Sequence, residues 1–283
     1  MGERKYKLAE ILDPRFGVAF KRISNALRAH SLTFVEWVRP EEAEATIIHV
    51  VGGEEYEKAK NIKNAVIFQH CVFTTQIKIN EWEKLWEKSI LTVSFHDLHD
   101  YSDKNFNHFS TPWGAEPSLF YRDGRSKDVT IFATGHVAET EKLREIYDAC
   151  VGTGSYMFHT GENFRWGNNY HFLNYMNDDD FRTMLNRSKY IGCLRENEGF
   201  EMMGIEGAFC GAVPLIPNLH TYRWYEGFGK FIEMDKDIVG QLEAIFKSDY
   251  RELDSESIKE IVDKFSWKRI ATNIFNEIFK VID

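Results

Sequence analysis

The chain has 283 residues, 43% of them hydrophobic and 28% charged, a composition that is typical of a globular protein and excludes a disordered one. No apolar run approaches the roughly 18 to 20 residues that span a bilayer, which excludes a membrane-embedded protein. The first 30 residues are charged and lack a continuous apolar stretch, so we expect no secretory signal there.

The four cysteines are scattered, and no two of them form a C-x-x-C pair. They are Cys71, Cys150, Cys193 and Cys210. This spacing argues against a disulfide framework and against a structural zinc site. We therefore expect a cytoplasmic protein.

The charge balance of 35 basic and 44 acidic residues gives a net charge of -9, so no overall field attracts nucleic acid. Basic residues outnumber acids only in the N-terminal stretch. They are Arg4, Lys5, Lys7, Arg15, Lys21, Arg22 and Arg28. A solvated helix face explains most clusters of this kind, and a surface that faces DNA is the alternative.

The first half of the chain alternates short apolar runs with helical stretches, which predicts a parallel sheet covered by helices. The predicted strands are Lys7–Leu12, Ala45–Val51, Ala65–Phe68 and Ile90–Phe95. A helix is predicted over Gly17–His30, because its apolar residues recur at helical spacing. Gly17 is the one glycine of the turn before this helix, so the turn lacks a dinucleotide fingerprint.

Prolines and glycines cluster in the polar segment Thr111–Lys127, which predicts a domain boundary. A second alternation of strands and helices follows. The predicted strands are Asp128–Thr134, Ser155–His159, Tyr170–Asn174, Tyr190–Leu194 and Pro214–Pro217, and the predicted helices are Glu139–Cys150, Asp178–Arg187, Ile205–Cys210, Ser255–Phe265 and Ser266–Ile282. The last helix is so apolar along one side that it must pack on another part of the protein.

The segment Arg195–Pro217 (RENEGFEMMGIEGAFCGAVPLIP) carries the most informative pattern. Seven residues separate Glu198 from Glu206, Gly-Phe directly follows the first glutamate, and a Gly-x-x-Pro follows the second. A carboxylate can accept hydrogen bonds from two adjacent sugar hydroxyls, and backbone N–H groups at the start of a helix favour an anionic diphosphate. The alternative is a pair of solvated helix glutamates.

This arrangement resembles the E-G-F-G-x-x-x-x-E signature of retaining, nucleotide-sugar-dependent glycosyltransferases of the GT-B fold, the large group-1 family. The resemblance implies that Glu198 binds the donor sugar, that Glu206 binds the ribose, and that the backbone of Gly199, Phe200 and Glu201 lies beside the donor.

Further segments resemble the family in the same order along the chain. Tyr170–Leu173 (YHFL) stands where the backbone cradles the nucleobase, which makes Phe172 and Leu173 candidates for donor binding. Ser110–Phe120 resembles the linker between the family's domains, and Val262–Ala271 (VDKFSWKRIA) resembles the start of its closing helix. The resemblance runs from about residue 90 to the end, and before that it is only architectural.

One departure concerns the diphosphate. The family commonly has G-R-L and then Lys-Gly after the first strand of the donor domain, whereas this chain has Thr134–Glu139 (TGHVAE) with His136 at the arginine position. A doubly charged leaving group needs cationic or N–H partners. The candidates that replace the clamp are His136, Arg165, Arg195 and Lys21 or Arg22, with Gly17 also on the donor side.

Histidines follow several predicted strands of the first half, at the edge where open α/β sheets bind ligands. The resemblance implies that one of them touches the donor sugar, with His70 the first choice as a catalytic residue and His49 the second. His96 is a further candidate on the acceptor side. The H-D-L-H-D run from His96 to Asp100 would suit a metal, but the family generally works without one, so we expect no metal and no cofactor besides the nucleotide sugar.

The sequence thus predicts an α/β protein of the GT-B fold, with two Rossmann-like domains that face a cleft. Residues 1–124 form the acceptor-side domain, residues 125–265 form the donor domain, and residues 266–283 form a helix that crosses back to the first domain. The expected activity is transfer of a sugar from a nucleoside-diphosphate sugar to a hydroxyl with retention. The acceptor stays open between a hydroxymethylated DNA base, as in bacteriophages, and a glycan, lipid carrier or small molecule. A non-catalytic module that binds a nucleotide sugar is the other alternative, and the sequence does not define an oligomeric state.

Overall fold

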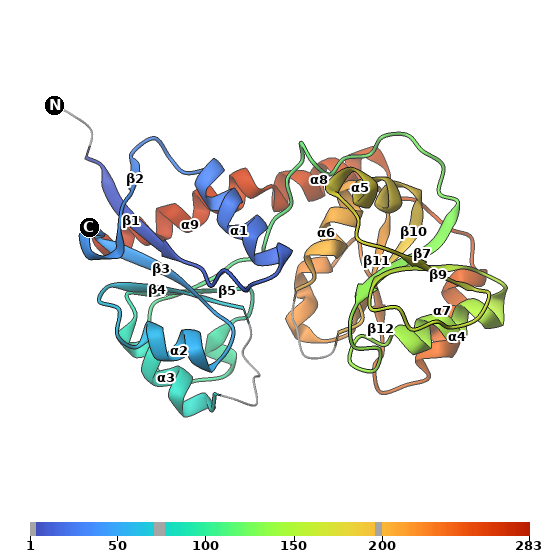
Figure 1. The fold of residues 1–283 in the computed structure, drawn as a ribbon, viewed down its shortest axis with the longest axis horizontal. Coiled ribbons are helices and arrows are strands. Elements are labelled where there is room, and N and C mark those ends of the chain that lie inside the picture. The colour runs from blue at the N-terminus through green and yellow to red at the C-terminus, as the bar shows by residue number, and fades with distance from the viewer. Residues whose placement is uncertain (1–3, 71–76, 196–199) are drawn as a thin grey trace. The chain divides into compact units, whose positions relative to one another are not determined.

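The computed structural model describes residues 4–70, 77–195 and 200–283. It separates into two compact units (Figure 1): Met1–Gly114 with Trp267–Asp283 forms unit 1, and Ala115–Ser266 forms unit 2. The predicted boundaries follow residues 124 and 265, whereas the units of the structure divide after Gly114 and Ser266.

Unit 1 contains a parallel six-stranded sheet in the order β2-β1-β3-β4-β5-β6. Its strands are β1 (Tyr6–Ile11), β2 (Val35–Trp37), β3 (Ala45–Val50), β4 (Ala65–Gln69), β5 (Leu91–Ser94) and β6 (His108–Ser110). Its helices are α1 (Val18–Ala29), α2 (Gly53–Ala59), α3 (Ile79–Lys88) and α9 (Trp267–Ile282), with 3-10 turns η1 (Pro40–Glu42) and η2 (Leu98–Asp100). Every residue of β3, β4 and β5 is buried, because α1 and α9 cover one face of the sheet and α2 and α3 cover the other (Figure 1).

Helix α9 packs its apolar side on unit 1. The buried side chains are Trp267, Ile270, Ala271, Ile274, Phe275, Ile278 and Phe279. The ring of Phe279 stacks on Tyr6 of β1 with centroids 4.2 Å apart. The Tyr6 hydroxyl also donates to Asp283 (2.8 Å), so the C-terminus lies beside the first strand (Figure 1).

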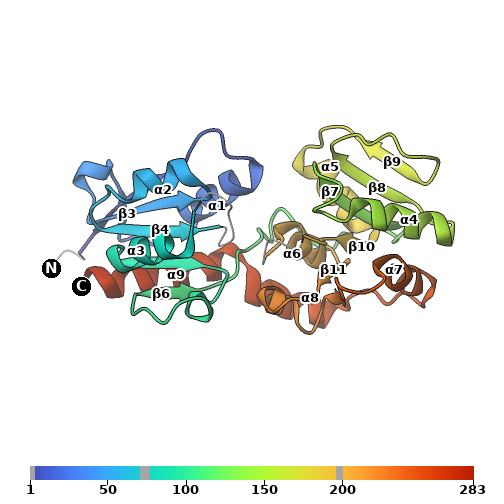
Figure 2. The same ribbon diagram turned by 90° about the horizontal axis from the view of Figure 1, so that it is seen from below.

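Unit 2 contains a second parallel six-stranded sheet, in the order β12-β11-β10-β7-β8-β9. Its strands are β7 (Val129–Gly135), β8 (Met157–Gly161), β9 (Tyr170–Leu173), β10 (Ser188–Gly192), β11 (Val213–Pro217) and β12 (Lys230–Ile232). Figure 2 shows them from β9 at one edge through β8, β7 and β10 to β11. Counted along the chain the order is 3-2-1-4-5-6, that of the Rossmann fold.

Helices cover both faces of this sheet too. They are α4 (Leu143–Thr153), α5 (Asp178–Arg187), α6 (Met202–Phe209), α7 (Ile238–Lys247) and α8 (Ser255–Phe265), with the 3-10 turn η3 (His220–Tyr225). Ile131 and Ala133 of β7 point into a core shared with α4 and α7. Phe132, between them, points the other way and meets Phe181 of α5. This alternation explains why β7 is apolar on both sides.

Most predicted elements agree with the structure within a few residues, and α5 and α8 agree at both ends. Helix α4 begins at Leu143 and not at Glu139, because Lys142 takes a left-handed conformation with a φ of 52°. Helix α6 begins at Met202, three residues earlier than predicted. Among the described helices, none is both long and apolar enough to cross a bilayer.

Gly161→Ala should destabilise unit 2. Gly161 ends β8 opposite Gly135 with a φ of +126°, and an added Cβ would overlap the carbonyl oxygen of Gly135. Strain and overlap together should lower the free energy of unfolding by about 3 kcal/mol. Urea unfolding measures this loss.

Gly154→Ala is the matched control. Gly154 also has a positive φ (+68°), but nothing lies within 4 Å of an added Cβ. This variant should lose about 1 kcal/mol through backbone strain alone. Equal losses in the two variants would contradict the close approach of β7 and β8.

Candidate active site

The sheet of unit 2 has its switch point between β7 and β10, where the chain stops adding strands on one side and continues on the other. Ligands of open α/β proteins bind outside the carboxyl ends of the strands at such a point. Two segments lie there: residues 136–142 follow β7, and residues 193–201 follow β10. The second contains the first half of the E-x7-E pattern.

An ion pair joins these two segments. The Arg195 guanidinium donates to one carboxylate oxygen of Glu141, and the other oxygen accepts the backbone N–H of Val137 at 2.9 Å. The Nε of Arg195 also lies 3.4 Å from a carboxylate oxygen of Glu201. Arg195 therefore lies between two carboxylates. Sequence analysis selected it as a cation for the diphosphate, and in the structure it also links the two loops.

Two buried tyrosines of η3 hold both ends of the segment that carries Glu198. The hydroxyl of Tyr222 donates to the Arg195 carbonyl oxygen at 2.6 Å. The hydroxyl of Tyr225 donates to the Glu201 carbonyl oxygen and accepts the Glu201 N–H at 3.1 Å. Burial raises the pKa of Tyr225 well above its usual value, so this hydroxyl stays protonated. Sequence analysis missed both tyrosines, because their partners are backbone atoms that leave no pattern in the sequence.

The E-x7-E pattern is described only in part. Glu198 and Gly199 lie outside the described residues. Phe200 is buried against the Tyr225 ring, with centroids 5.6 Å apart, and Glu201 is the residue that precedes α6. Glu206 lies on α6 and is only 2% exposed. A carboxylate buried at this depth needs polar partners, so the interpretation as two solvated helix glutamates is wrong for Glu206.

Cys193 lies between β10 and Arg195 and is buried. Burial, together with the charge of Glu201, raises the pKa of its thiol well above the usual value. Burial also raises the pKa of Cys150 and of Cys210 to about 12. These raised pKa values favour the neutral thiol at physiological pH and argue against a thiolate role for the three cysteines.

The other donor-side candidates of unit 2 lie on loops or at strand ends along the same edge of the sheet. His136 is exposed directly after β7, and Arg165 is exposed in the loop after β8 with a φ of 52°. Phe172 and Leu173 are half-buried at the end of β9. His136 belongs to the same loop after β7 as the Glu141 that pairs with Arg195.

Unit 1 has its own switch point, between β1 and β3, and the two preferred histidines meet beside it. His49 lies near the end of β3, and His70 directly follows β4. Nδ1 of His49 lies 2.9 Å from Nε2 of His70, and Nε2 of His49 lies 3.0 Å from a carboxylate oxygen of Glu10 on β1. Sequence analysis missed Glu10, which the strand order alone brings to His49.

The remaining candidates of unit 1 lie on several elements. His96 is buried after β5, where its backbone N–H donates to the Ser94 hydroxyl oxygen at 3.0 Å. Gly17 is exposed and precedes α1, while Lys21 is exposed and Arg22 half-buried on that helix.

Among the described residues, one set of side chains has its ligand atoms close enough together for a metal, namely Asp13, Glu54 and Glu55. Arg15 pairs with Asp13 and Glu54, and Lys58 lies 3.6 Å from Asp13, so two of the three carboxylates already have a cationic partner. The group gives no support for a metal centre.

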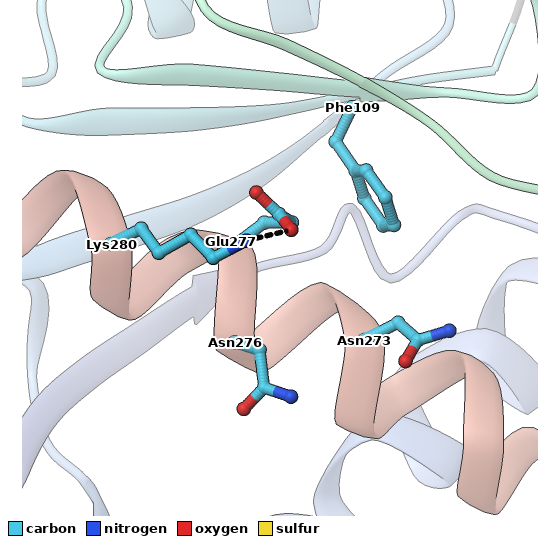
Figure 3. Close-up of a pocket in the computed structure, with 5 residues that line it drawn as sticks. All are labelled: Phe109, Asn273, Asn276, Glu277 and Lys280. Carbon is cyan, nitrogen blue, oxygen red and sulfur yellow. Dashed lines mark hydrogen bonds and ion pairs between the residues drawn. The ribbon is translucent and has the colours of Figure 1, made fainter.

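A shallow pocket of about 460 Å³ lies on the surface of unit 1 (Figure 3). Phe109 of β6 lines it together with four polar side chains of α9, which are Asn273, Asn276, Glu277 and Lys280. Lys280 pairs with Glu277 at 2.6 Å. The pocket holds none of the residues selected above, and its one lysine is already paired with a carboxylate.

No protein-family model matches the chain, and no curated protein matches its sequence. Solved structures match it over nearly its whole length. AviGT4, a glycosyltransferase involved in avilamycin A biosynthesis, is 10% identical with a TM-score of 0.69, over 98% of both chains. Sucrose-phosphate synthase from Thermosynechococcus elongatus is 10% identical with a TM-score of 0.75, over 98% of this chain and 99% of that one.

A trehalose-6-phosphate synthase studied for glycosyl transfer with retention is 13% identical with a TM-score of 0.60, over 94% of this chain and 80% of that one. These structural neighbours are GT-B glycosyltransferases. At such low identities the likeness shows the fold, and it confirms the predicted GT-B fold class.

Glu141→Gln should destabilise unit 2, because a carboxamide has one acceptor oxygen for the two donors that now reach the carboxylate. Either the Arg195 guanidinium or the Val137 N–H then loses its partner. An unsatisfied group at this partly buried position should cost about 2 kcal/mol of unfolding free energy. Urea unfolding followed by circular dichroism measures it.

Asp148→Asn on α4 is the control for this variant. Asp148 pairs with Arg144 on the exposed side of the helix at 3.0 Å. Exposed pairs contribute little, so we expect a loss of about 0.5 kcal/mol or less. A Glu141→Gln loss no larger than this would contradict the bridging role of Glu141.

Proposed function

We propose that the protein transfers a sugar from a nucleoside-diphosphate sugar to a hydroxyl acceptor with retention of anomeric configuration. The proposal is carried by the position of Arg195 and Glu201, the described residues on either side of Glu198. They lie at the switch point of a Rossmann-ordered sheet, in a chain with the GT-B fold. The fold alone would leave the function open, because one fold supports many functions.

The proposed donor site lies on unit 2. Glu198 accepts hydrogen bonds from the donor sugar, and Glu206 accepts from the ribose. The backbone of Phe200 and Glu201, just before α6, lies beside the diphosphate, and the Glu201 N–H itself donates to Tyr225. The backbone around Phe172 and Leu173 at the end of β9 cradles the nucleobase. The contacts of Tyr222 with Arg195 and of Tyr225 with Glu201 support these roles, since they hold the described residues on both sides of Glu198.

The proposed chemistry uses no enzyme nucleophile. The leaving phosphate and nearby N–H groups assist a substitution on one face of the sugar, and His136, Arg165 and Arg195 share the phosphate charge. Arg195 can contribute although it is paired, because Glu141 and Glu201 fix its position before the donor binds. We also propose that turnover needs no metal ion, which EDTA treatment would test directly.

The acceptor has weaker support. Of the N-terminal basic residues, Arg4 pairs with Glu44 and Asp283, Arg15 pairs with Asp13 and Glu54, and Arg28 pairs with Glu10. These carboxylates neutralise charge that a DNA backbone would need. We therefore favour a glycan, lipid-carrier or small-molecule acceptor over a hydroxymethylated DNA base.

Incubation with a panel of nucleotide sugars, followed by measurement of released nucleotide, tests the function. Release that depends on an added acceptor, with the product anomer assigned by NMR, would support retaining transfer. Hydroxymethylated duplex DNA should be one acceptor of the panel. Tight nucleotide binding with no release under any combination would favour the non-catalytic module instead.

Glu206→Ala should weaken the binding of nucleoside diphosphate, because it removes an anionic acceptor from the ribose diol. Charged hydrogen bonds of this type contribute about 1.5 to 3 kcal/mol, and calorimetry measures the affinity. Glu256→Ala on the exposed start of α8 is the control and should bind like wild type. Unchanged affinity in Glu206→Ala would remove Glu206 from the site.

Glu198→Gln should reduce turnover more than nucleotide affinity, since its proposed partner is the sugar. We expect at least a tenfold lower kcat at saturating donor, which corresponds to about 1.4 kcal/mol of lost transition-state stabilisation. Glu196→Gln removes a carboxylate from the same segment outside the E-x7-E pair and should keep wild-type turnover. A Glu198→Gln enzyme as active as that control would refute the assignment.

A further inference from the structure

Three polar side chains from neighbouring strands form a buried row at the switch point of unit 1. Glu10 lies on β1, His49 on β3, and His70 directly after β4, and these strands are adjacent in the sheet. The hydrogen bonds that join them are 3.0 Å between Glu10 and His49 and 2.9 Å between His49 and His70. The side chains of Glu10 and His49 are 1% and 0% exposed.

The surroundings of Glu10 fix the direction of these hydrogen bonds. Its second carboxylate oxygen accepts from the Ser24 hydroxyl at 2.9 Å and from Nε of Arg28 at 3.0 Å. Burial alone would raise the pKa of Glu10, but hydrogen bonds from His49 and Ser24 and the charge of Arg28 outweigh it and lower the pKa. Glu10 is therefore an ionised acceptor, and Nε2 of His49 must carry a proton toward it.

The proton on Nε2 of His49 also decides which ring donates in the hydrogen bond between His49 and His70. Arg28 already balances the Glu10 charge, and a second cation in a row this deeply buried would be costly, which favours a single ring proton on His49. Its Nδ1 then has a lone pair and accepts from Nε2–H of His70. Burial lowers the pKa of His70 well below its usual value, so His70 is neutral.

Two aromatic rings fix the orientation of the His70 ring. Phe20 of α1 meets it edge-on with centroids 4.8 Å apart, and Trp113 lies 5.1 Å away. Within the described part of the chain, Nδ1 of His70 has no hydrogen-bond partner. This nitrogen is therefore the one with which His70 can meet a ligand.

We propose that Glu10 and His49 are positioning residues that hold His70 as the tautomer protonated on Nε2, so that its Nδ1 lone pair accepts a hydrogen bond from a hydroxyl of a sugar substrate. The identity of this ligand rests on the proposed function. The tautomer does not, because it depends on the contacts of Glu10, His49 and His70 and on a single ring proton at His49, without any substrate.

Glu10→Gln tests the proposal, because it should reverse the donor and acceptor roles in both hydrogen bonds of the row. Arg28 and Ser24 both donate to the second oxygen of Glu10, so the carboxamide should place its oxygen there and its NH2 toward His49. The NH2 would donate to Nε2 of His49, Nδ1 of His49 would carry the proton, and His70 would become the tautomer protonated on Nδ1. Nitrogen NMR of 15N-histidine-labelled protein distinguishes the two tautomers of each ring.

The wild-type spectrum is decisive by itself. His70 protonated on Nδ1 in the wild-type protein would overturn the proposal even if the variant failed to fold. Ser24→Ala is the matched control, because it removes one donor to Glu10 but leaves the contact with His49. Its His70 should keep the wild-type tautomer, and a reversed tautomer there would also contradict the argument.

Kinetics test the role of the lone pair. In Glu10→Gln we expect kcat to fall about tenfold or more, because Nδ1 of His70 no longer accepts, while calorimetry should give unchanged affinity for the nucleoside diphosphate. A reversed tautomer with wild-type kcat would overturn the role of His70. If wild type transfers no sugar at all, the proposed function fails, and the NMR result still decides whether Glu10 and His49 set the tautomer.

Discussion

The constraint on which both units depend is the direction of their strands. In a parallel sheet all carboxyl ends meet at one edge, and the loops after two neighbouring strands diverge where the chain changes sides. This happens between β1 and β3 in unit 1 and between β7 and β10 in unit 2. The Glu10–His49 and Glu141–Arg195 contacts lie at these two places. Each unit therefore carries a buried or half-buried charge where an α/β sheet opens to a ligand.

Charged groups at such an edge are stable only if the protein satisfies them. Glu141 accepts from two donors, and Glu10 accepts from three, so neither carboxylate depends on water. Tyr222 and Tyr225 do the same for backbone atoms of the segment after β10. These hydrogen bonds also fix the positions of the groups that they join, because the partners come from different elements. A site built in this way is arranged before any substrate binds, which is what electrostatic stabilisation of a leaving group requires.

Much of the fold could be predicted from the sequence, because buried parallel strands leave continuous apolar runs between helices. Strands β3, β4 and β7 follow such runs closely. Strands β2, β6 and β12 have three residues each, too few to form a pattern. The predicted start of α4 at Glu139 was wrong because the chain there makes tertiary contacts: Glu141 turns back to Val137 and across to Arg195, and Lys142 leaves the helical conformation. Local propensity contains no information on contacts of this kind.

Some residues of the candidate sites could likewise be predicted from the sequence, and others could not. The spacing of Glu198 and Glu206 can be recognised in the sequence because both lie in one segment. The resemblance to a family then implies a role for each glutamate. Glu10 is 39 residues from His49, and Glu141 is 54 residues from Arg195, so no local spacing relates the members of either pair. The strand order is the missing information. Once β1 is known to lie beside β3, and β7 beside β10, the polar residues near their carboxyl ends must meet, because adjacent parallel strands bring their ends together. A sequence pattern thus identifies residues of a site within one segment, and strand order identifies the partners that hold them.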